Sequence, residues 1–167
     1  KKLYAAPGSD AIPAERVPLK ATDSAALVAF AKEKAVDLVV IGPEDPLAQG
    51  TADSLRAAGF LVFGPGKAAA QLEASKSFAK DFMTRHGVPT ARWERHTSFD
   101  VAKAALARFP DGVVVKADGL AAGKGVRVCQ ARSSAEAALE EMMVKQTHGT
   151  AGTTVVLEEL LEGPEVS

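Results

Sequence analysis

The chain has 167 residues, of which 47% are hydrophobic, enough to bury the core of one large domain or two small ones. Its 20 lysine and arginine residues against 21 acidic ones give a net charge of -1, so there is no basic excess to attract nucleic acid or an anionic membrane. Apolar runs such as residues 38–41 are far too short to span a bilayer. We expect a soluble globular protein in which any phosphate chemistry is local.

Cys129 is the only cysteine, which excludes an internal disulfide and a cysteine zinc cluster and fits the reducing cytosol. His86, His96 and His148 have no second histidine or carboxylate at ligand spacing, so we expect each to be structural or solvated. These patterns predict a cytoplasmic protein with no metal ligands in this chain.

The first part of the chain alternates short strands with short helices. Strands are expected over residues 3–6, 38–41 and 60–63, and helices after Asp23 and over residues 51–58. Residues 38–41 are apolar throughout, which is typical of a strand buried on both faces of a parallel sheet. Strand, helix and strand with short turns indicate a right-handed parallel crossover.

Ligands of such sheets bind at the carboxyl ends of the strands, and residues 42–47 occupy that position as a predicted loop. The loop holds Pro43, Glu44, Asp45 and Pro46. In the simpler interpretation the prolines shape a turn and the carboxylates are solvated. Taken alone, the residues favour that interpretation.

Residues 67–86 have apolar residues every three to four positions, which predicts one helix that ends at Gly87. Lys76 and Lys80 share a face of this helix. Two such lysines are ordinarily a solvated stripe, but this helix joins the first part of the chain to the second. Either lysine could therefore face a cleft.

The remaining residues predict a second, antiparallel α/β unit. Its strands are expected at residues 91–96, 113–116, 126–128 and 153–157, its helices at 98–108 and from Ser133 or Ser134 to about Lys145, and a loop at 147–152. The two central strands enclose a loop with Gly119, Gly123, Lys124 and Gly125.

Glycines let backbone N–H groups approach an anion closely, and Lys116 and Lys124 bring positive charge to the same loop, so ATP is the candidate ligand. The loop is neither a P-loop nor a dinucleotide fingerprint, because three residues, and not four, lie between Gly119 and Gly123, and because Val126 opens a strand. A glycine-rich hairpin turn with a solvated lysine is the simpler interpretation. The loop alone favours nucleotide binding only slightly.

Several motifs in one order connect these parts of the chain. They lie at residues 6–8, 42–47, 63–65, 67–76, 86–90, 115–126 and 158–163. With them the chain resembles the ATP-grasp superfamily, and specifically the phosphoribosylamine–glycine ligase (glycinamide ribonucleotide synthetase) family. The resemblance implies a partial Rossmann-like parallel-sheet domain followed by an incomplete ATP-grasp domain with an antiparallel hairpin lid.

The resemblance also implies roles for individual residues. Lys76 and Lys116 would reach the nucleotide phosphates, and the loop from Gly119 to Gly125 would fold over them as a lid, with Lys116 and Lys124 as the catalytic lysines. These ammonium groups would neutralise phosphate charge. The implied domains are residues 1–66, a connecting helical segment over 67–90, and an ATP-grasp subdomain over 91–167.

The resemblance implies that Glu158 belongs to the ATP site and that backbone groups around Glu159 and Leu161 bind the adenine edge. Glu165 would accept the ribose hydroxyls, because a carboxylate is a good acceptor for a diol. The remaining implied contacts are those of Gly8, Pro43, Glu44, Asp45 and Pro46, which would face the phosphoribosylamine.

The activity that the resemblance implies is ATP-dependent joining of glycine to 5-phosphoribosylamine through glycyl phosphate, in purine biosynthesis. Mg²⁺ or Mn²⁺ would assist, with ligands after Ser167, so we expect this chain by itself to be catalytically incomplete. One alternative is another ATP-grasp ligase or carboxylase, although residues 42–47 and 67–76 argue against it. The other is a non-catalytic nucleotide-binding module.

Overall fold

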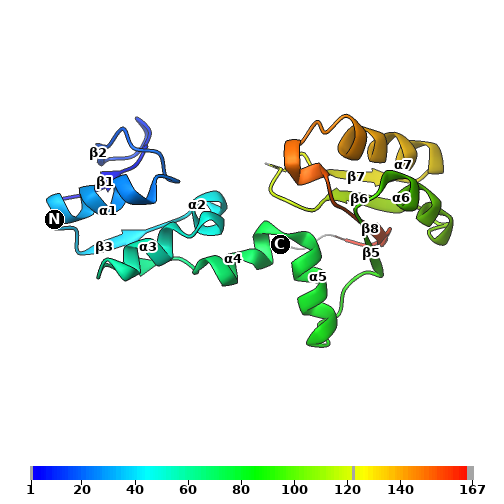
Figure 1. Ribbon diagram of the computed structural model, residues 1–167, viewed down its shortest axis with the longest axis horizontal. Coiled ribbons are helices and arrows are strands. Elements are labelled where there is room, and N and C mark those ends of the chain that lie inside the picture. The colour runs from blue at the N-terminus through cyan, green and yellow to red at the C-terminus, as the bar shows by residue number, and fades with distance from the viewer. Residues whose placement is uncertain (1, 122, 165–167) are drawn as a thin grey trace. The chain divides into compact units, whose positions relative to one another are not determined.

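The computed structural model describes residues 2–121 and 123–164, and the chain divides into two compact units, Lys1–Gln71 and Leu72–Ser167 (Figure 1). The fold is mixed α/β, with parallel strands in the first unit and an antiparallel sheet in the second. This confirms the fold class that the sequence predicted. The division with a separate connecting segment over residues 67–90 stays a prediction.

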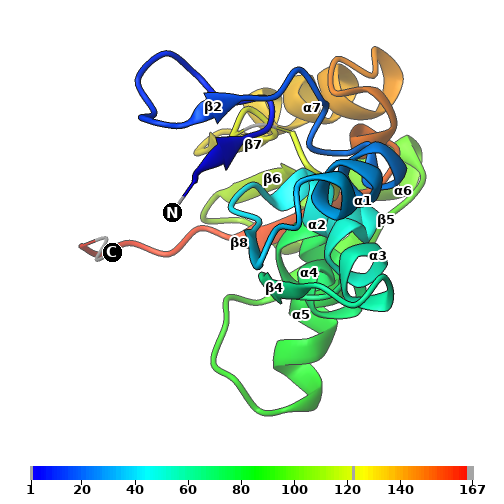
Figure 2. The same ribbon diagram turned by 90° about the vertical axis from the view of Figure 1, so that its left-hand side faces the viewer.

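The first unit contains two pairs of parallel strands, and the pair nearest the N-terminus is drawn in blue in Figure 2. Tyr4 lies opposite Glu15 in one pair, and Val39 lies opposite Val62 in the other. The elements are β1 (Tyr4–Ala5), β2 (Glu15–Arg16), α1 (Ser24–Glu33), β3 (Leu38–Val40), α2 (Glu44–Gln49), α3 (Thr51–Ala57), β4 (Leu61–Phe63) and the start of α4 (Lys67–Ala74).

Asp23 begins α1 as the sequence predicted, because its carboxylate accepts a hydrogen bond from the Ala26 backbone N–H at 3.0 Å. The hydroxyls of Ser24 and Thr51 lie 2.9 Å apart and link α1 to α3. Small residues such as Ala31 and Ala52 are buried, which lets these short helices pack closely.

The prediction that residues 38–41 are buried on both faces is wrong. Leu38 and Val40 are 55% and 64% exposed, and on β4 Leu61 and Phe63 are both 71% exposed. Successive side chains of a strand point to opposite faces, and only the face with Val62 and Ile41 packs against buried Leu47. The apolar run thus contributes one buried and one open face.

The expected loop over residues 42–47 is also wrong, because α2 begins at Glu44. Pro43 is extended at φ -71° and ψ 147°, and Glu44 and Asp45 occupy the first turn, where carboxylates interact favourably with the helix dipole. Pro46 fits there because the first turn makes no use of its missing N–H. The two prolines frame a helix start rather than a turn.

The single helix expected over residues 67–86 is instead two helices, α4 and α5 (Lys76–Arg85). Ser75 interrupts them with extended backbone angles, φ -134° and ψ 116°, and its hydroxyl accepts a hydrogen bond from the Phe78 N–H at 3.1 Å. The apolar spacing runs through this break because a side-chain cap, not a change of pattern, ends one helix and begins the next.

The second unit is built on a four-stranded antiparallel sheet in the order β5-β8-β6-β7. The predicted hairpin around residues 113–128 is confirmed as β6 and β7. The elements of the second unit after α5 are β5 (Trp93–His96), α6 (Phe99–Ala105), the 3-10 turn η1 (Leu106–Arg108), β6 (Val113–Ala117), β7 (Val126–Cys129), α7 (Arg132–Leu139), the π-helical turn η2 (Glu140–Val144), the 3-10 turn η3 (Gly149–Gly152) and β8 (Val155–Glu159).

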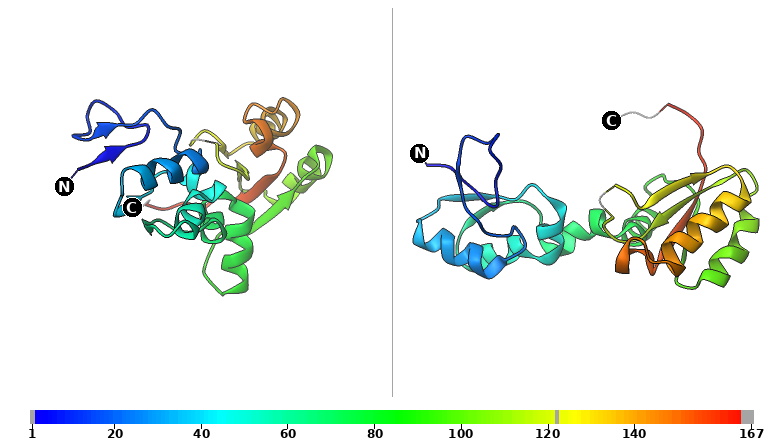
Figure 3. Two further views of the ribbon diagram at one scale, coloured as in Figure 1. Left: turned by 60° about the vertical axis from the view of Figure 1, so that its left-hand side comes forward. Right: turned by 90° about the horizontal axis from the view of Figure 1, so that it is seen from above.

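One face of this sheet carries the core of the unit. Val113, Val115 and Ala117 of β6 alternate toward this face and join Val155 and Leu157 of β8, all of them 3% exposed or less. Helices α6 and α7 cover the same face (Figure 3). The intervening residues of β6 and β8 therefore point to the opposite face, where α5 lies.

Helix α5 is attached to that opposite face by polar contacts along β5 and β8. Trp93 lies opposite Glu158 in the register, and its indole N–H donates to the Thr84 hydroxyl of α5 at 3.3 Å. Arg95 donates to the Asp81 carboxylate at 3.3 Å. The sheet therefore separates an apolar face from a charged one.

Shortening Leu157 tests the assignment of the apolar face. Leu157→Ala should lower the free energy of unfolding of the second unit by about 2–5 kcal/mol, because the side chain is fully buried and its loss leaves a cavity. Urea unfolding followed by fluorescence of Trp93 measures this, since the single tryptophan reports only the second unit. Val128→Ala, at a site 64% exposed, is the matched control and should change stability by less than about 0.5 kcal/mol; equal effects would contradict the assignment.

Candidate functional site

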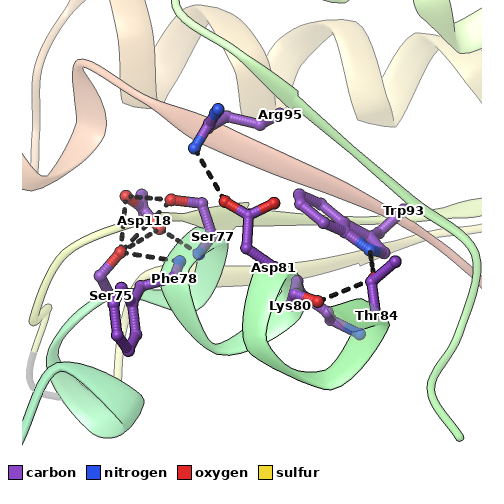
Figure 4. Close-up of polar contacts among 9 residues, drawn as sticks. All are labelled: Ser75, Ser77, Phe78, Lys80, Asp81, Thr84, Trp93, Arg95 and Asp118. Carbon is purple, nitrogen blue, oxygen red and sulfur yellow. Dashed lines mark hydrogen bonds and ion pairs between the residues drawn. The ribbon is translucent and has the colours of Figure 1, made fainter. Parts of the chain in front are cut away.

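The carboxylate of Asp118, directly after β6, caps the start of α5 (Figure 4). It accepts hydrogen bonds from the Ser77 backbone N–H at 2.5 Å and the Ser77 hydroxyl at 3.0 Å, and from the Ser75 hydroxyl at 3.2 Å. A negative charge at a helix N-terminus also interacts favourably with the helix dipole. One side chain thus ties the glycine loop to α5.

Lys76 lies at this junction and bonds to the loop through both backbone and side chain. Its N–H donates to the Asp118 carbonyl at 3.0 Å, and its ammonium donates to the Gly119 carbonyl at 3.2 Å. Asp118 was not among the site residues that the sequence suggested. The sequence feature that could have indicated a helix start here is Ser-Lys-Ser at residues 75–77, because serine hydroxyls commonly cap helices.

Burial lowers the pKa of the Lys76 ammonium below its ordinary value of 10.5; the negative charge of Asp118 opposes this, and the positive charge of Lys116 adds to it. Lys76 and Lys116, predicted to share a ligand, are therefore close enough to repel each other. A bound anion would favour the charged form of Lys76 and raise its pKa again.

Glu158 of β8 lies beside Lys116 on the charged face of the sheet, and it is only 5% exposed. One carboxylate oxygen is 2.9 Å from the Lys116 ammonium, and the other is 2.9 Å from the Lys80 ammonium of α5. Lys80 also donates to the Thr90 hydroxyl at 2.6 Å. The sequence left the environment of Lys80 open, and the structure places it against a buried carboxylate.

The glycine loop supplies backbone where side chains would not fit. A Cβ on Gly125 would lie 2.6 Å from the Ala121 Cβ, and the Gly125 carbonyl accepts a hydrogen bond from the Ala117 N–H at 2.8 Å. Gly123 has a φ of +76°, which side chains rarely adopt. Lys124 is exposed on the same loop.

At the end of β8, the Glu159 carboxylate accepts a hydrogen bond from the Arg92 N–H at 2.7 Å, while the Glu159 N–H donates to the Arg92 carbonyl at 2.9 Å. The Glu159 N–H is thus already bonded within the sheet. Leu161 is exposed after the strand ends. The predicted ribose acceptor, Glu165, lies outside the described residues.

The residues suggested for a second substrate lie in the first unit. Gly8 has a φ of +71°, and a Cβ there would meet the Ala5 carbonyl oxygen at 2.9 Å. At the start of α2, Glu44 is exposed, Asp45 accepts a hydrogen bond from the Gln49 amide at 2.9 Å, and Pro46 is buried.

A cavity of about 330 Å³ also lies in the first unit, bounded by β1, α1 and β3. Its walls are mostly apolar, with Tyr4, Phe30 and Leu55 among them, and of the suggested substrate residues it includes Pro43. Apolar walls do not match the chemistry of a phosphate ligand, so the charged face beneath α5 is the stronger candidate site.

Within residues 2–121 and 123–164, no group of three or more histidine, cysteine or acidic side chains is arranged to hold a metal ion. In the same part of the chain, no helix is both long and apolar enough to cross a membrane.

Comparison with known proteins identifies the fold. Solved structures with the same fold include phosphoribosylamine–glycine ligase from Thermotoga maritima (TM-score 0.67, 28% identity, 90% of this chain and 35% of that one) and biotin carboxylase from Campylobacter jejuni (TM-score 0.70, 22% identity, 84% of this chain and 32% of that one). The chain thus has the fold of about a third of each of these two enzymes.

The family is shown by two family models that together match every residue. They are the phosphoribosylglycinamide synthetase N domain at residues 1–73 and the phosphoribosylglycinamide synthetase ATP-grasp (A) domain at residues 74–167. The chain belongs to the phosphoribosylglycinamide synthetase family, which confirms the resemblance of its motifs.

Relatives with the name phosphoribosylamine–glycine ligase cover nearly the whole chain. The protein from Agrobacterium fabrum is 52% identical over 167 residues, and that from Mesorhizobium japonicum is 51% identical over 168 residues. Both alignments include 99% of this chain but 39% of the relative. The chain therefore spans about two-fifths of the length of these relatives.

Replacing Asp118 tests its role at the start of α5. Asp118→Ala should destabilise the second unit by roughly 1.5–3 kcal/mol, because a carboxylate that accepts several hydrogen bonds is lost. It should also speed hydrogen exchange at the Ser77 amide, whose acceptor is removed. Asp111→Ala, in the exposed turn before β6, is the control; unchanged exchange at Ser77 in the Asp118 variant would show that the cap is not needed.

Proposed function

We propose that this chain forms the nucleotide-binding part of an ATP-dependent carbon–nitrogen ligase that joins glycine to 5-phosphoribosylamine. The observation that carries the proposal is the contact of the Lys76 ammonium with the Gly119 carbonyl at 3.2 Å, beside the loop that follows Lys116 on β6. Two cations beside a glycine-rich backbone can neutralise the several charges of a polyphosphate, whereas a single ion pair cannot. Membership of the family and relatives named for this reaction support the choice of substrates.

In this proposal Lys76 and Lys116 hold the nucleotide phosphates, and residues 119–125 cover them with Lys124 contributing charge. Glu158 lies behind Lys116, and the backbone at Glu159 and Leu161 borders the adenine. Because the Glu159 N–H is bonded to Arg92, we assign recognition of the base to carbonyl groups and to Leu161. Glu165 would accept the ribose hydroxyls.

The proposed reaction has two steps. A carboxylate oxygen of glycine attacks the γ-phosphorus of ATP, which forms glycyl phosphate and releases ADP. The amine of phosphoribosylamine then attacks the carbonyl carbon, the C–O bond to phosphate breaks, and the amine loses a proton, so that glycinamide ribonucleotide and phosphate are formed. Lysines lower the repulsion between the carboxylate and the phosphates in the first step.

Gly8 and the start of α2, with Pro43, Glu44, Asp45 and Pro46, are proposed to face the phosphoribosylamine. Their support is the position of this segment after a parallel strand, where small ligands of such sheets bind. Exposed Glu44 and Asp45 can accept hydrogen bonds from ribose hydroxyls, while buried Pro46 would act by fixing the helix start.

Mg²⁺ or Mn²⁺ is the proposed metal, and it would neutralise the β- and γ-phosphates. The described residues do not fit a metal site, because they contain no cluster of suitable ligands. We therefore assign no metal ligand among residues 2–121 and 123–164. A net charge of -1 and a single cysteine support a cytoplasmic enzyme that acts on small molecules without a nucleic acid or membrane partner.

Removing Lys116 tests nucleotide binding. Lys116→Ala should weaken ATP binding by about 10–100-fold, because a hydrogen bond between charged groups is lost, while Lys80 still neutralises Glu158 and the fold is kept. Isothermal titration calorimetry with ATP measures the affinity, and circular dichroism checks the fold. Lys145→Ala, at an exposed lysine paired with Glu140, is the control; equal affinities of the Lys116 variant and the parent would remove Lys116 from the site.

A second experiment tests the reaction itself. In a protein that contains this chain and has the length of its relatives, ADP release should require both glycine and phosphoribosylamine, whereas the 167 residues alone should form no glycinamide ribonucleotide. Turnover is followed by ADP release and product mass. ADP release that needs neither substrate, or that prefers another acid and amine, would refute the ligase assignment and leave the ATP-grasp fold intact.

A further inference from the structure

Lys80, Glu158 and Lys116 form a buried cluster of three charges from α5, β8 and β6. Glu158 is 5% exposed, Lys80 is 8% exposed, and the side chain of Lys116 is 26% exposed. Each lysine contacts a different oxygen of the same carboxylate at 2.9 Å. Of the three side chains, Lys116 is therefore the one that is partly exposed to solvent while it contacts a buried carboxylate.

Lys80 changes how strongly Glu158 holds the Lys116 ammonium. A buried carboxylate with a single cation holds that cation strongly, since separating the pair would leave an uncompensated charge out of water. With Lys80 on its other oxygen, Glu158 stays neutralised whichever way the Lys116 ammonium turns. The cluster then has a net charge of +1, whereas without Lys80 the Lys116 and Glu158 pair would be neutral.

We propose that Lys80 is a positioning residue for Lys116: it neutralises Glu158, so that the Lys116 ammonium is available to the phosphates of a nucleotide. Lys80 acts through the carboxylate and does not contact the nucleotide. This inference rests on the proposed function, because it needs the phosphates to bind at Lys116.

The surroundings of Lys80 favour an indirect role. Its ammonium is enclosed by the Glu158 carboxylate and the Thr90 hydroxyl, at 2.9 Å and 2.6 Å. An ammonium group has three N–H donors, so these two acceptors leave at most one for any other group. Lys76, one helical turn earlier on α5, donates to the Gly119 carbonyl of the loop instead. Of the two lysines of α5, Lys76 thus contacts the glycine loop and Lys80 contacts the buried carboxylate.

The test compares ATP affinity, in the presence of Mg²⁺, among the parent chain, Lys80→Met and the double variant Lys80→Met/Glu158→Gln. Lys80→Met should weaken binding about tenfold or more, because Lys116 then has to stay with Glu158 to neutralise that buried carboxylate. The double variant should return to within about threefold of the parent, since an uncharged amide no longer competes with phosphate for Lys116. A lysine needed only for packing or for direct contact would give no such rescue.

Two further variants complete the comparison. Lys80→Arg keeps the positive charge and should bind ATP about as the parent does. Lys103→Met removes a lysine that pairs with Glu136 on the other side of the sheet, and it should leave affinity unchanged. If Lys80→Met does not fold by circular dichroism, Lys80→Gln with and without Glu158→Gln makes the same comparison with a polar side chain.

Unchanged affinity of Lys80→Met would overturn the inference, and so would a double variant as weak as the single one. Either result, with the parent binding ATP and Lys116→Ala impaired, leaves the proposed function standing. A parent chain that binds no ATP would refute the nucleotide site, and the inference would fail with it.

Discussion

The strict alternation of side chains along β6 and β8 is the constraint on which the second unit depends. Val115 and Leu157 point to the face that α6 and α7 cover, so Lys116 and Glu158 necessarily point to the other. A shift of one residue in the register would bury both charges among aliphatic side chains. The same pattern that builds the core therefore delivers a lysine and a carboxylate to the charged face as neighbours.

Asp118 converts that arrangement into a site by connecting strand, loop and helix. Its carboxylate holds Ser75 and Ser77, and this fixes where α5 begins and which way Lys76 and Lys80 point. The two lysines are four residues apart, yet one reaches the loop carbonyl and the other reaches Glu158. Because Asp118 fixes the start of α5, this helix places Lys76 at the glycine loop and Lys80 at Glu158.

Sequence patterns predicted the elements whose signals are local: the Asp23 cap and the β6–β7 hairpin. They failed where the structure of a segment depends on contacts with residues far away in the sequence. The break at Ser75 depends on Asp118, which is 43 residues away, and the exposed face of β3 depends on what covers the strand. In the site, charge and glycine content marked Lys116 and its loop, whereas the contact of Lys80 with Glu158 required α5 and β8 to be placed together.

The contacts that hold α5 to the sheet differ greatly in their exposure to solvent. Arg95 and Asp81 have side chains about half exposed, whereas Lys80 and Glu158 are almost enclosed. Dissolved ions screen exposed charges far more than buried ones. Rising ionic strength should therefore weaken the Arg95 contact while the Lys80 contact persists, so that salt would loosen α5 at Asp81 but leave it attached to the sheet at Lys80.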